Sequence, residues 1–156
     1  MIKPRTPAAA FALVAAITTF ATACGEQVCN LVGCTSGVTV NLPAFDGGDR
    51  FDVVVETAVG AGSFGCERVE AGGYDVVDIA GDFANDDSVL TPSCRRDGFI
   101  LGGNGLPATL TTTVSTTANG AEVSRTGSFT DIDYGVHRPN GPDCEPECRN
   151  AAVELE

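Results

Sequence analysis

The dipeptide Asn119-Gly120 is the feature that most constrains the fold of this chain, because both residues accept positive φ and favour a two-residue type I′ turn between antiparallel strands. Counting outward from the turn sets the register, since Ala118 must oppose Ala121. The pairs on one face are then Thr117 with Glu122, Ser115 with Ser124, Thr113 with Thr126, Thr111 with Ser128, and Thr109 with Thr130. The sequence therefore predicts a long hairpin with a wholly polar solvent face.

The other face of this hairpin carries the apolar residues of a core-facing side. Its pairs are Leu110 with Phe129, Thr116 with Val123, and Val114 with Arg125. A charge such as Arg125 does not suit a core, so we interpret it as the mark of a sheet edge or a bulge. Thr and Ser suit solvated strands, and the functional alternative for the polar face is a regular ligand such as ice or a glycan.

Short runs of alternating apolar and polar residues continue along the chain. The predicted strands are 38–42, 51–56, one through Phe64 and Cys66, 92–94, 99–101 and 151–156, while 74–79 is either a strand or a short helical turn. Glycine-rich turns separate these strands, and no convincing long helix follows residue 23. This spacing predicts an all-β chain folded as an antiparallel β-sandwich of immunoglobulin-like type, with disulfides.

The glycines of Gly60–Gly65 formally match the G-x-G-x-x-G fingerprint of dinucleotide-binding proteins. That fingerprint requires a buried strand before it and a full helix after it. Here the preceding strand carries Asp52 and Glu56, and Gly72-Gly73 interrupts a few residues later. We therefore predict a glycine-rich turn leading into a strand, and no cofactor.

Residues 1–23 have the three parts of a secretory signal peptide: a basic start, an apolar run too short to span a membrane, and small residues before a cleavage point. The stretch Ala21-Thr22-Ala23-Cys24 resembles the bacterial lipobox, whose cysteine is acylated, although Ala21 stands where Leu is commonest. The resemblance implies a lipoprotein anchored through Cys24, carrying palmitate or a similar acyl chain. The same small residues also fit ordinary signal peptidase, which would release a soluble secreted form.

Cysteine parity gives an independent argument for lipidation of Cys24. The chain has seven cysteines, and an unpaired thiol is a liability in an exported protein. Without Cys24, six remain to pair: Cys29, Cys34, Cys66, Cys94, Cys144 and Cys148. Disulfides are the default for such thiols in an oxidising compartment, rather than metal binding. The favoured pairs are Cys29 with Cys34, Cys66 with Cys94, and Cys144 with Cys148; if the first and last strands lie side by side, Cys34 pairs with Cys148 instead.

The end of the chain also carries a resemblance. The pattern Pro139-Asn140-Gly141 followed by Cys144-x-Pro146-x-Cys148, together with the start Gly33–Val38, resembles uncharacterised putative lipoproteins of GC-rich bacteria. This resemblance implies export and anchoring but no activity. The expected organisation is a signal peptide at 1–23, a lipidated N-terminus with a short cysteine-containing loop at 24–37, and one β-sandwich domain at 38–156.

After residue 23 the chain has seven arginines, no lysine and all 21 acidic residues, a net charge of 7 minus 21, or −14. Nucleic acid is therefore excluded as a partner. The acidic stretch with Asp82, Asn85, Asp86 and Asp87 suggests calcium, but it lacks the EF-hand spacing, and we expect a solvated loop.

The residues supply no convincing catalytic set, since His137 is the only histidine and Ser63 lacks the flanking glycines of a nucleophile elbow. We expect a non-enzymatic binding, adhesion or structural module of the cell envelope. Its partners would be the lipid bilayer, through Cys24, and an envelope protein or glycan; Gly25 after the cysteine favours the outer membrane in a diderm bacterium. The alternatives are a small secreted hydrolase and a calcium-dependent or carbohydrate-binding module.

Overall fold

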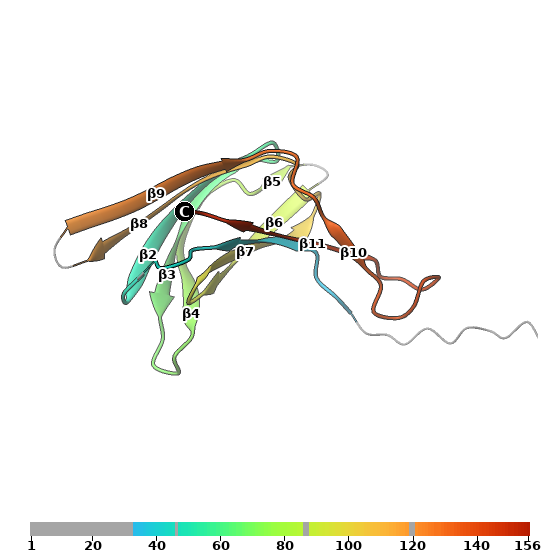
Figure 1. Ribbon diagram of the computed structural model, residues 1–156, viewed down its shortest axis with the longest axis horizontal. Coiled ribbons are helices and arrows are strands. Elements are labelled where there is room, and N and C mark those ends of the chain that lie inside the picture. The colour runs from blue at the N-terminus through green and yellow to red at the C-terminus, as the bar shows by residue number, and fades with distance from the viewer. Residues whose placement is uncertain (1–32, 46, 86–87, 119–120) are drawn as a thin grey trace, which may run out of the picture.

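The computed structural model describes residues 33–45, 47–85, 88–118 and 121–156, and in these residues it is all-β, with two sheets packed face to face (Figure 1). The six-stranded sheet has the order β10 (Gly135–His137), β11 (Cys148–Glu154), β1 (Gly37–Asn41), β7 (Gly98–Asn104), β6 (Ser88–Arg95), β5 (Ala84–Asn85). The five-stranded sheet has the order β4 (Tyr74–Gly81), β3 (Ala61–Arg68), β2 (Arg50–Thr57), β8 (Leu110–Ala118), β9 (Ala121–Phe129). The predicted antiparallel β-sandwich with disulfides is confirmed.

Alternation along the strands places the core between the sheets. In β2, Phe51, Val53 and Val55 are buried while the residues between them are exposed, as period-two patterning requires. The other fully buried large residues come from both sheets: Val38, Val40, Phe64, Phe99, Leu101, Leu110 and Val114. Burial of such side chains stabilises the fold by about 1.5 to 3 kcal/mol each.

The β8–β9 hairpin has the predicted register. Pairing runs without interruption from Ala118 opposite Ala121 to Leu110 opposite Phe129, while residues 119 and 120 of the turn lie outside the described residues. The predicted Thr109–Thr130 pair falls beyond the ladder. The edge interpretation of Arg125 is confirmed, because β9 is the last strand of its sheet.

Residues 74–79 belong to strand β4, which confirms the strand alternative over the short helical turn. The short edge strands β5 and β10 had no clear pattern in the sequence. The strand order also differs from that of an immunoglobulin constant domain. β2, β3 and β4 form a three-strand meander in one sheet, whereas an immunoglobulin constant domain divides its strands as ABED and CFG.

Strand β1 pairs with β11 in parallel, so the first and last strands of the sandwich are neighbours. This pairing brings the Cα atoms of Cys34 and Cys148 to 6.0 Å, and the two residues form a disulfide. The favoured pairs of Cys29 with Cys34 and of Cys144 with Cys148 are therefore wrong, and the alternative based on adjacent first and last strands is confirmed. Cys144 is disulfide-bonded as well.

The predicted disulfide between Cys66 and Cys94 is confirmed, with Cα atoms 5.6 Å apart. It joins β3 of one sheet to β6 of the other, so it fixes the two layers to each other. Disulfides persist in oxidising compartments, and these two are typical of a protein that folds outside the cytoplasm.

The sandwich has two distinct ends. We call the end that holds the Cys34–Cys148 disulfide the proximal end, since the described chain begins there. At the other, distal end, Asn41 of β1 pairs with Gly98 and with Glu154. Figure 1 places the end of β8 and the start of β9 far from the residues at which the described chain begins.

Candidate functional site

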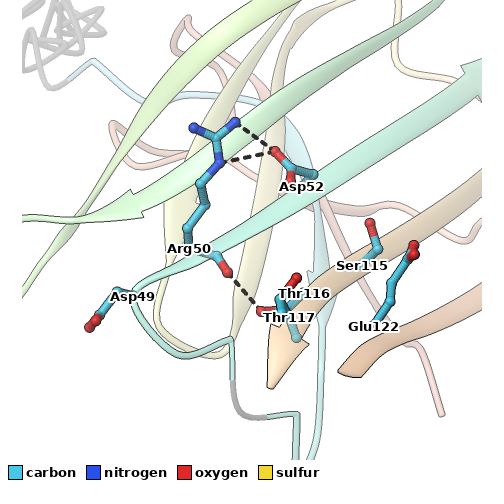
Figure 2. A pocket seen from close by; sticks show the side chains of 7 residues that line it. All are labelled: Asp49, Arg50, Asp52, Ser115, Thr116, Thr117 and Glu122. Carbon is cyan, nitrogen blue, oxygen red and sulfur yellow. Dashed lines mark hydrogen bonds and ion pairs between the residues drawn. The ribbon is translucent and has the colours of Figure 1, made fainter. Parts of the chain in front are cut away.

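An open polar depression lies on the outer face of the five-stranded sheet, near the distal end, and has a volume of about 440 Å³ (Figure 2). We call it the polar depression. Its lining residues come from the start of β2, the end of β8 and the start of β9: Asp49, Arg50, Asp52, Ser115, Thr116, Thr117 and Glu122. Hydroxyl, carboxylate and guanidinium groups therefore face one space.

The hairpin register places these side chains together. Asp52 of β2 lies opposite Ser115 of β8, and Ser115 lies opposite Ser124 of β9, so alternate residues of three strands share the outer face. Thr116 points the other way, is buried, and donates its hydroxyl hydrogen bond to the carbonyl oxygen of Arg50 at 2.7 Å. This bond fixes the start of β2 against β8.

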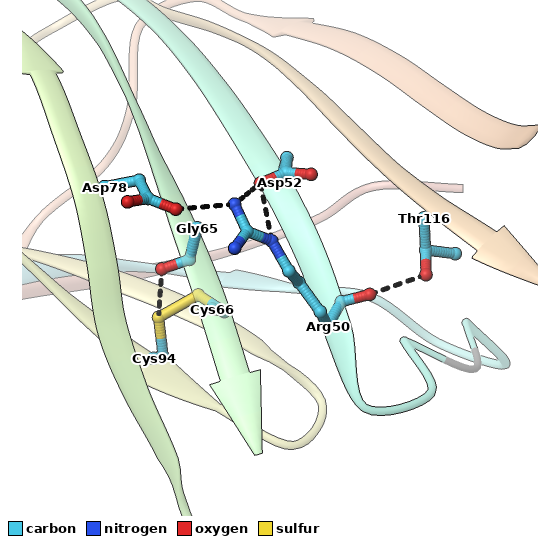
Figure 3. Close-up of polar contacts among 7 residues, drawn as sticks. All are labelled: Arg50, Asp52, Gly65, Cys66, Asp78, Cys94 and Thr116. Carbon is cyan, nitrogen blue, oxygen red and sulfur yellow. Dashed lines mark hydrogen bonds and ion pairs between the residues drawn. A yellow bond between two sulfur atoms is a disulfide. The ribbon is translucent and has the colours of Figure 1, made fainter.

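Arg50 spans three strands of the sheet (Figure 3). Its Nη2 lies 2.9 Å from a carboxylate oxygen of Asp52 on β2 and 2.9 Å from one of Asp78 on β4. The guanidinium crosses β3 at Gly65, where a Cβ atom would come within 3.0 Å of Arg50 Nη2 and 2.9 Å of a Val77 methyl group. Gly65 therefore leaves the space that lets the arginine reach β4.

The position of Asp78 depends on a local irregularity between β3 and β4. The register shifts between Ser63 and Gly65, and Asp78 adopts φ of 52°, a left-handed conformation that aspartate tolerates better than most residues. The hydrogen bond and charge of Asp52, followed by those of Asp78, raise the pKa of Arg50 above its ordinary value. Arg50 is thus a fixed cation at the rim of the polar depression.

Hydroxyl pairs extend from this depression along the outer face of β8 and β9. Thr113 and Thr126 hydroxyls lie 2.8 Å apart, and those of Thr111 and Ser128 lie 3.0 Å apart. These hydroxyls bond to each other across the strands, so part of the predicted polar face is already satisfied within the protein.

The structure separates the predicted candidates for catalysis and metal binding. His137 is exposed on edge strand β10 opposite Cys148, at the proximal end and far along the sandwich from the polar depression. Asp82 accepts a hydrogen bond from the backbone N–H of Ala84 at 2.9 Å. Asp86, Asp87 and the side chain of Asn85 lie outside the described part of the chain.

In the described ranges, no group of three or more His, Cys, Asp or Glu side chains is placed to hold a metal ion. Across the same ranges, no helix is long and apolar enough to cross a membrane. Cys24 and Cys29 precede the first described residue.

Sequence reasoning placed the hairpin residues of the polar depression on one polar face but did not predict the depression itself. Asp49, Arg50 and Glu122 are ordinary surface charges in the sequence, and only the order of β2, β8 and β9 in the sheet brings them together. The predicted hairpin register placed Ser115, Thr117 and Glu122 on one face. The sequence did not predict that β2 pairs with β8, which completes the depression.

Comparison of the chain with protein-family models, curated proteins and solved structures finds no match.

Proposed function

We propose that this chain is an exported, lipid-anchored and non-enzymatic binding module of the cell envelope. In this proposal acylated Cys24 holds the chain at a bilayer, which is the outer membrane if the bacterium is diderm, and the distal end of the sandwich faces the ligand. The ligand is an envelope protein or a glycan.

The observation that carries the proposal is that the described chain begins at the proximal end, whereas the polar depression lies near the distal end. Cys34 follows Cys24 by ten steps along the chain, and an extended chain covers at most about 3.5 Å per step, or roughly 35 Å. The Cys34–Cys148 disulfide fixes the proximal end of the sandwich to this short segment. A lipid at Cys24 would therefore keep the proximal end near the bilayer and leave the distal end accessible.

The composition of the polar depression favours binding over hydrolysis. A hydrolytic site needs a nucleophile, a base and an orienting group within reach of one another. The lining residues Ser115, Thr116 and Thr117 have no histidine beside them, since His137 lies at the proximal end. The secreted hydrolase therefore ranks below the binding module.

Carbohydrate is the more specific candidate ligand for the polar depression. Its carboxylates accept hydrogen bonds, Arg50 donates them, and Ser115 and Thr117 do both, which is the mixed chemistry that sugar hydroxyl groups require. Calcium-dependent binding has no comparable observation among the described residues.

Metabolic labelling with an alkyne fatty acid tests the anchor. We expect the wild-type chain to become labelled and to fractionate with membranes, and Cys24→Ala to lose both the label and the membrane association. Ala21→Leu is the matched variant, because it restores the commonest lipobox residue, and we expect it to be labelled at least as well as wild type. An unlabelled wild type that is released in soluble form would overturn the anchoring proposal in favour of a secreted protein.

A further inference from the structure

A second depression at the distal end contains two arginines in an otherwise acidic protein. We call it the arginine depression; its volume is about 300 Å³, and it is lined by Ala44, Phe45, Gly47, Arg68, Tyr74 and Arg96. An adjoining space of about 230 Å³ shares Arg68, Tyr74 and Arg96. These residues come from the loop after β1, from the end of β3 and the start of β4, and from the β6–β7 turn, so three separate parts of the chain build the depression.

Arg68 is held in position by its neighbours. Its guanidinium carbon lies 5.8 Å from the centre of the Tyr74 ring, and its Nη2 lies 3.3 Å from the Tyr74 hydroxyl oxygen. That hydroxyl donates to the carbonyl of Gly48 at 2.8 Å. The Tyr74 ring in turn packs against buried Phe51 at 5.7 Å between centroids. Arg68 is therefore oriented before any ligand arrives, which lowers the entropic cost of binding.

Ala44 and Phe45, on the opposite wall, are also constrained. Ala44 has φ of 55°, a left-handed conformation that a non-glycine residue keeps only where its surroundings fix it. Phe45 packs edge-on against Phe51 at 6.0 Å and lies under the Arg125 guanidinium at 5.5 Å. The wall of the depression is thus tied to the core and to β9.

Arg96 differs from the other arginines of the described residues in having no polar partner. Throughout the described residues it makes no hydrogen bond and no ion pair, although its side chain lines both spaces. Its neighbour Arg95 instead lies 3.5 Å from a carboxylate oxygen of Asp97. Arg96 therefore has all of its guanidinium donors available to a ligand.

The two arginines can attract an anion despite the net charge of the chain. Arg68 lies 3.4 Å from a carboxylate oxygen of Asp49, whose side chain is 92% exposed, so this ion pair is open to solvent. Within the described ranges Arg96 has no carboxylate partner. Carboxylates farther away than about 8 to 10 Å are largely screened at physiological ionic strength.

From this geometry we propose that the arginine depression binds an oxyanion, namely a carboxylate or phosphate group carried by a ligand of the distal end. The planar guanidinium of Arg96 offers two parallel N–H donors to such a group, and Arg68 adds a second, pre-oriented cation. The inference adds the chemistry of the ligand to the proposed binding function. It rests on that function in one respect, which is that the distal end is accessible to a ligand.

Calorimetric titration of the purified, non-lipidated mature chain tests the inference with two probes, trigalacturonate as a carboxylate source and inorganic phosphate as a phosphate source. We expect at least one probe to bind and Arg96→Ala to weaken that binding about 10-fold or more, since a hydrogen bond to a charged group is lost. Arg95→Ala is the matched control, because it removes the same charge from the adjacent residue outside the depression, and it should change affinity less than about 3-fold. Any binding of neutral maltotriose should be unchanged by Arg96→Ala, because a neutral sugar has no oxyanion for this depression.

Two outcomes would overturn the inference: no binding of either probe by the wild-type chain, or equal weakening by Arg95→Ala and Arg96→Ala, which would indicate nonspecific charge attraction. Arg96→Lys should bind the probe more tightly than Arg96→Ala but more weakly than wild type, because lysine keeps the positive charge and lacks the two parallel N–H donors of the guanidinium. These results are independent of fatty-acid labelling, so the oxyanion site can fail while the anchored binding module stands.

Discussion

The side chain of Arg125 connects an edge strand to two other segments of the chain. It points inward from edge strand β9, where its Nη1 donates to the carbonyl of Pro43 at 2.7 Å and lies 3.3 Å from that of Leu155. Leu155 is buried, and a Cβ at Gly127 of β9 would collide with its side chain. The arginine therefore connects β9 to the loop after β1 and to the end of the chain, while an inward charge also discourages pairing of the edge with another strand.

Replacing Arg125 with Ala should lower the free energy of unfolding by about 1 to 3 kcal/mol, because charge-assisted hydrogen bonds to two carbonyl groups are lost. Urea denaturation measures the change. Arg95→Ala is the control, since Arg95 is exposed and its substitution should change stability by no more than about 0.5 kcal/mol. Equal effects of the two substitutions would contradict the structural role assigned to Arg125.

Glu147 gives the proximal end a dependence on pH. The hydrogen bond and charge of Arg138, together with those of Arg149, lower the pKa of Glu147 below its ordinary value of 4.5. A carboxyl group with a lowered pKa stabilises the folded state at pH values above its unfolded pKa, and this contribution is lost as the pH falls through the folded pKa.

We therefore expect Glu147→Gln to be less stable than wild type at neutral pH, and the difference to disappear as the pH falls through the lowered pKa of Glu147. The measurement is the free energy of unfolding of both proteins across this pH range. Glu156→Gln, at the distal end, is the control and should show little difference at any pH. A difference between Glu147→Gln and wild type that persists unchanged in acid would contradict the ion pair.

At the scale of elements, the Cys66–Cys94 disulfide joins the sheets at strands that are not neighbours in sequence. It connects β3 and β6, 28 residues apart, and both strands also belong to ladders with their own neighbours. A cross-link of this length restricts the unfolded chain and, in the chain-entropy model, stabilises the fold by about 3 to 4 kcal/mol.

The double substitution Cys66→Ala and Cys94→Ala should therefore reduce stability by about 2 to 4 kcal/mol without changing the strand content seen by far-UV circular dichroism. Removing Cys34 and Cys148 together should cost at least as much, because that disulfide spans 114 residues. Denaturant titration under non-reducing conditions measures both changes. No loss of stability in either variant would show that the fold does not depend on these cross-links.

The elements also show what sequence can predict. Asn119-Gly120 determined the register of β8 and β9 because the chemistry of a tight turn is local, and alternation identified the buried face of β2 for the same reason. The favoured pair of Cys144 with Cys148 failed because proximity in sequence was given more weight than the parallel pairing of β1 with β11. Likewise, the polar depression depends on which strands are neighbours in the sheet, and no local pattern encodes that order.

For the whole molecule, the two ends differ in chemistry as well as position. The distal end carries both depressions, with Arg50 and Arg68 at their walls and Asp49 contributing to the polar depression and to the Arg68 ion pair. The proximal end carries the Cys34–Cys148 disulfide. An anchored chain would thus present polar recognition chemistry at one end and a cross-linked attachment at the other.

The place of β1 between β7 and β11 has a mechanical consequence for a tethered protein. A ligand that is pulled away from the distal end, against an anchor near Cys34, loads β1 along its own axis. In that direction the hydrogen bonds on both sides of β1 resist together in shear, rather than opening one after another as in peeling. In such a tethered protein the Cys34–Cys148 disulfide would pass part of the tension directly to β11, so β1 would not carry the load alone.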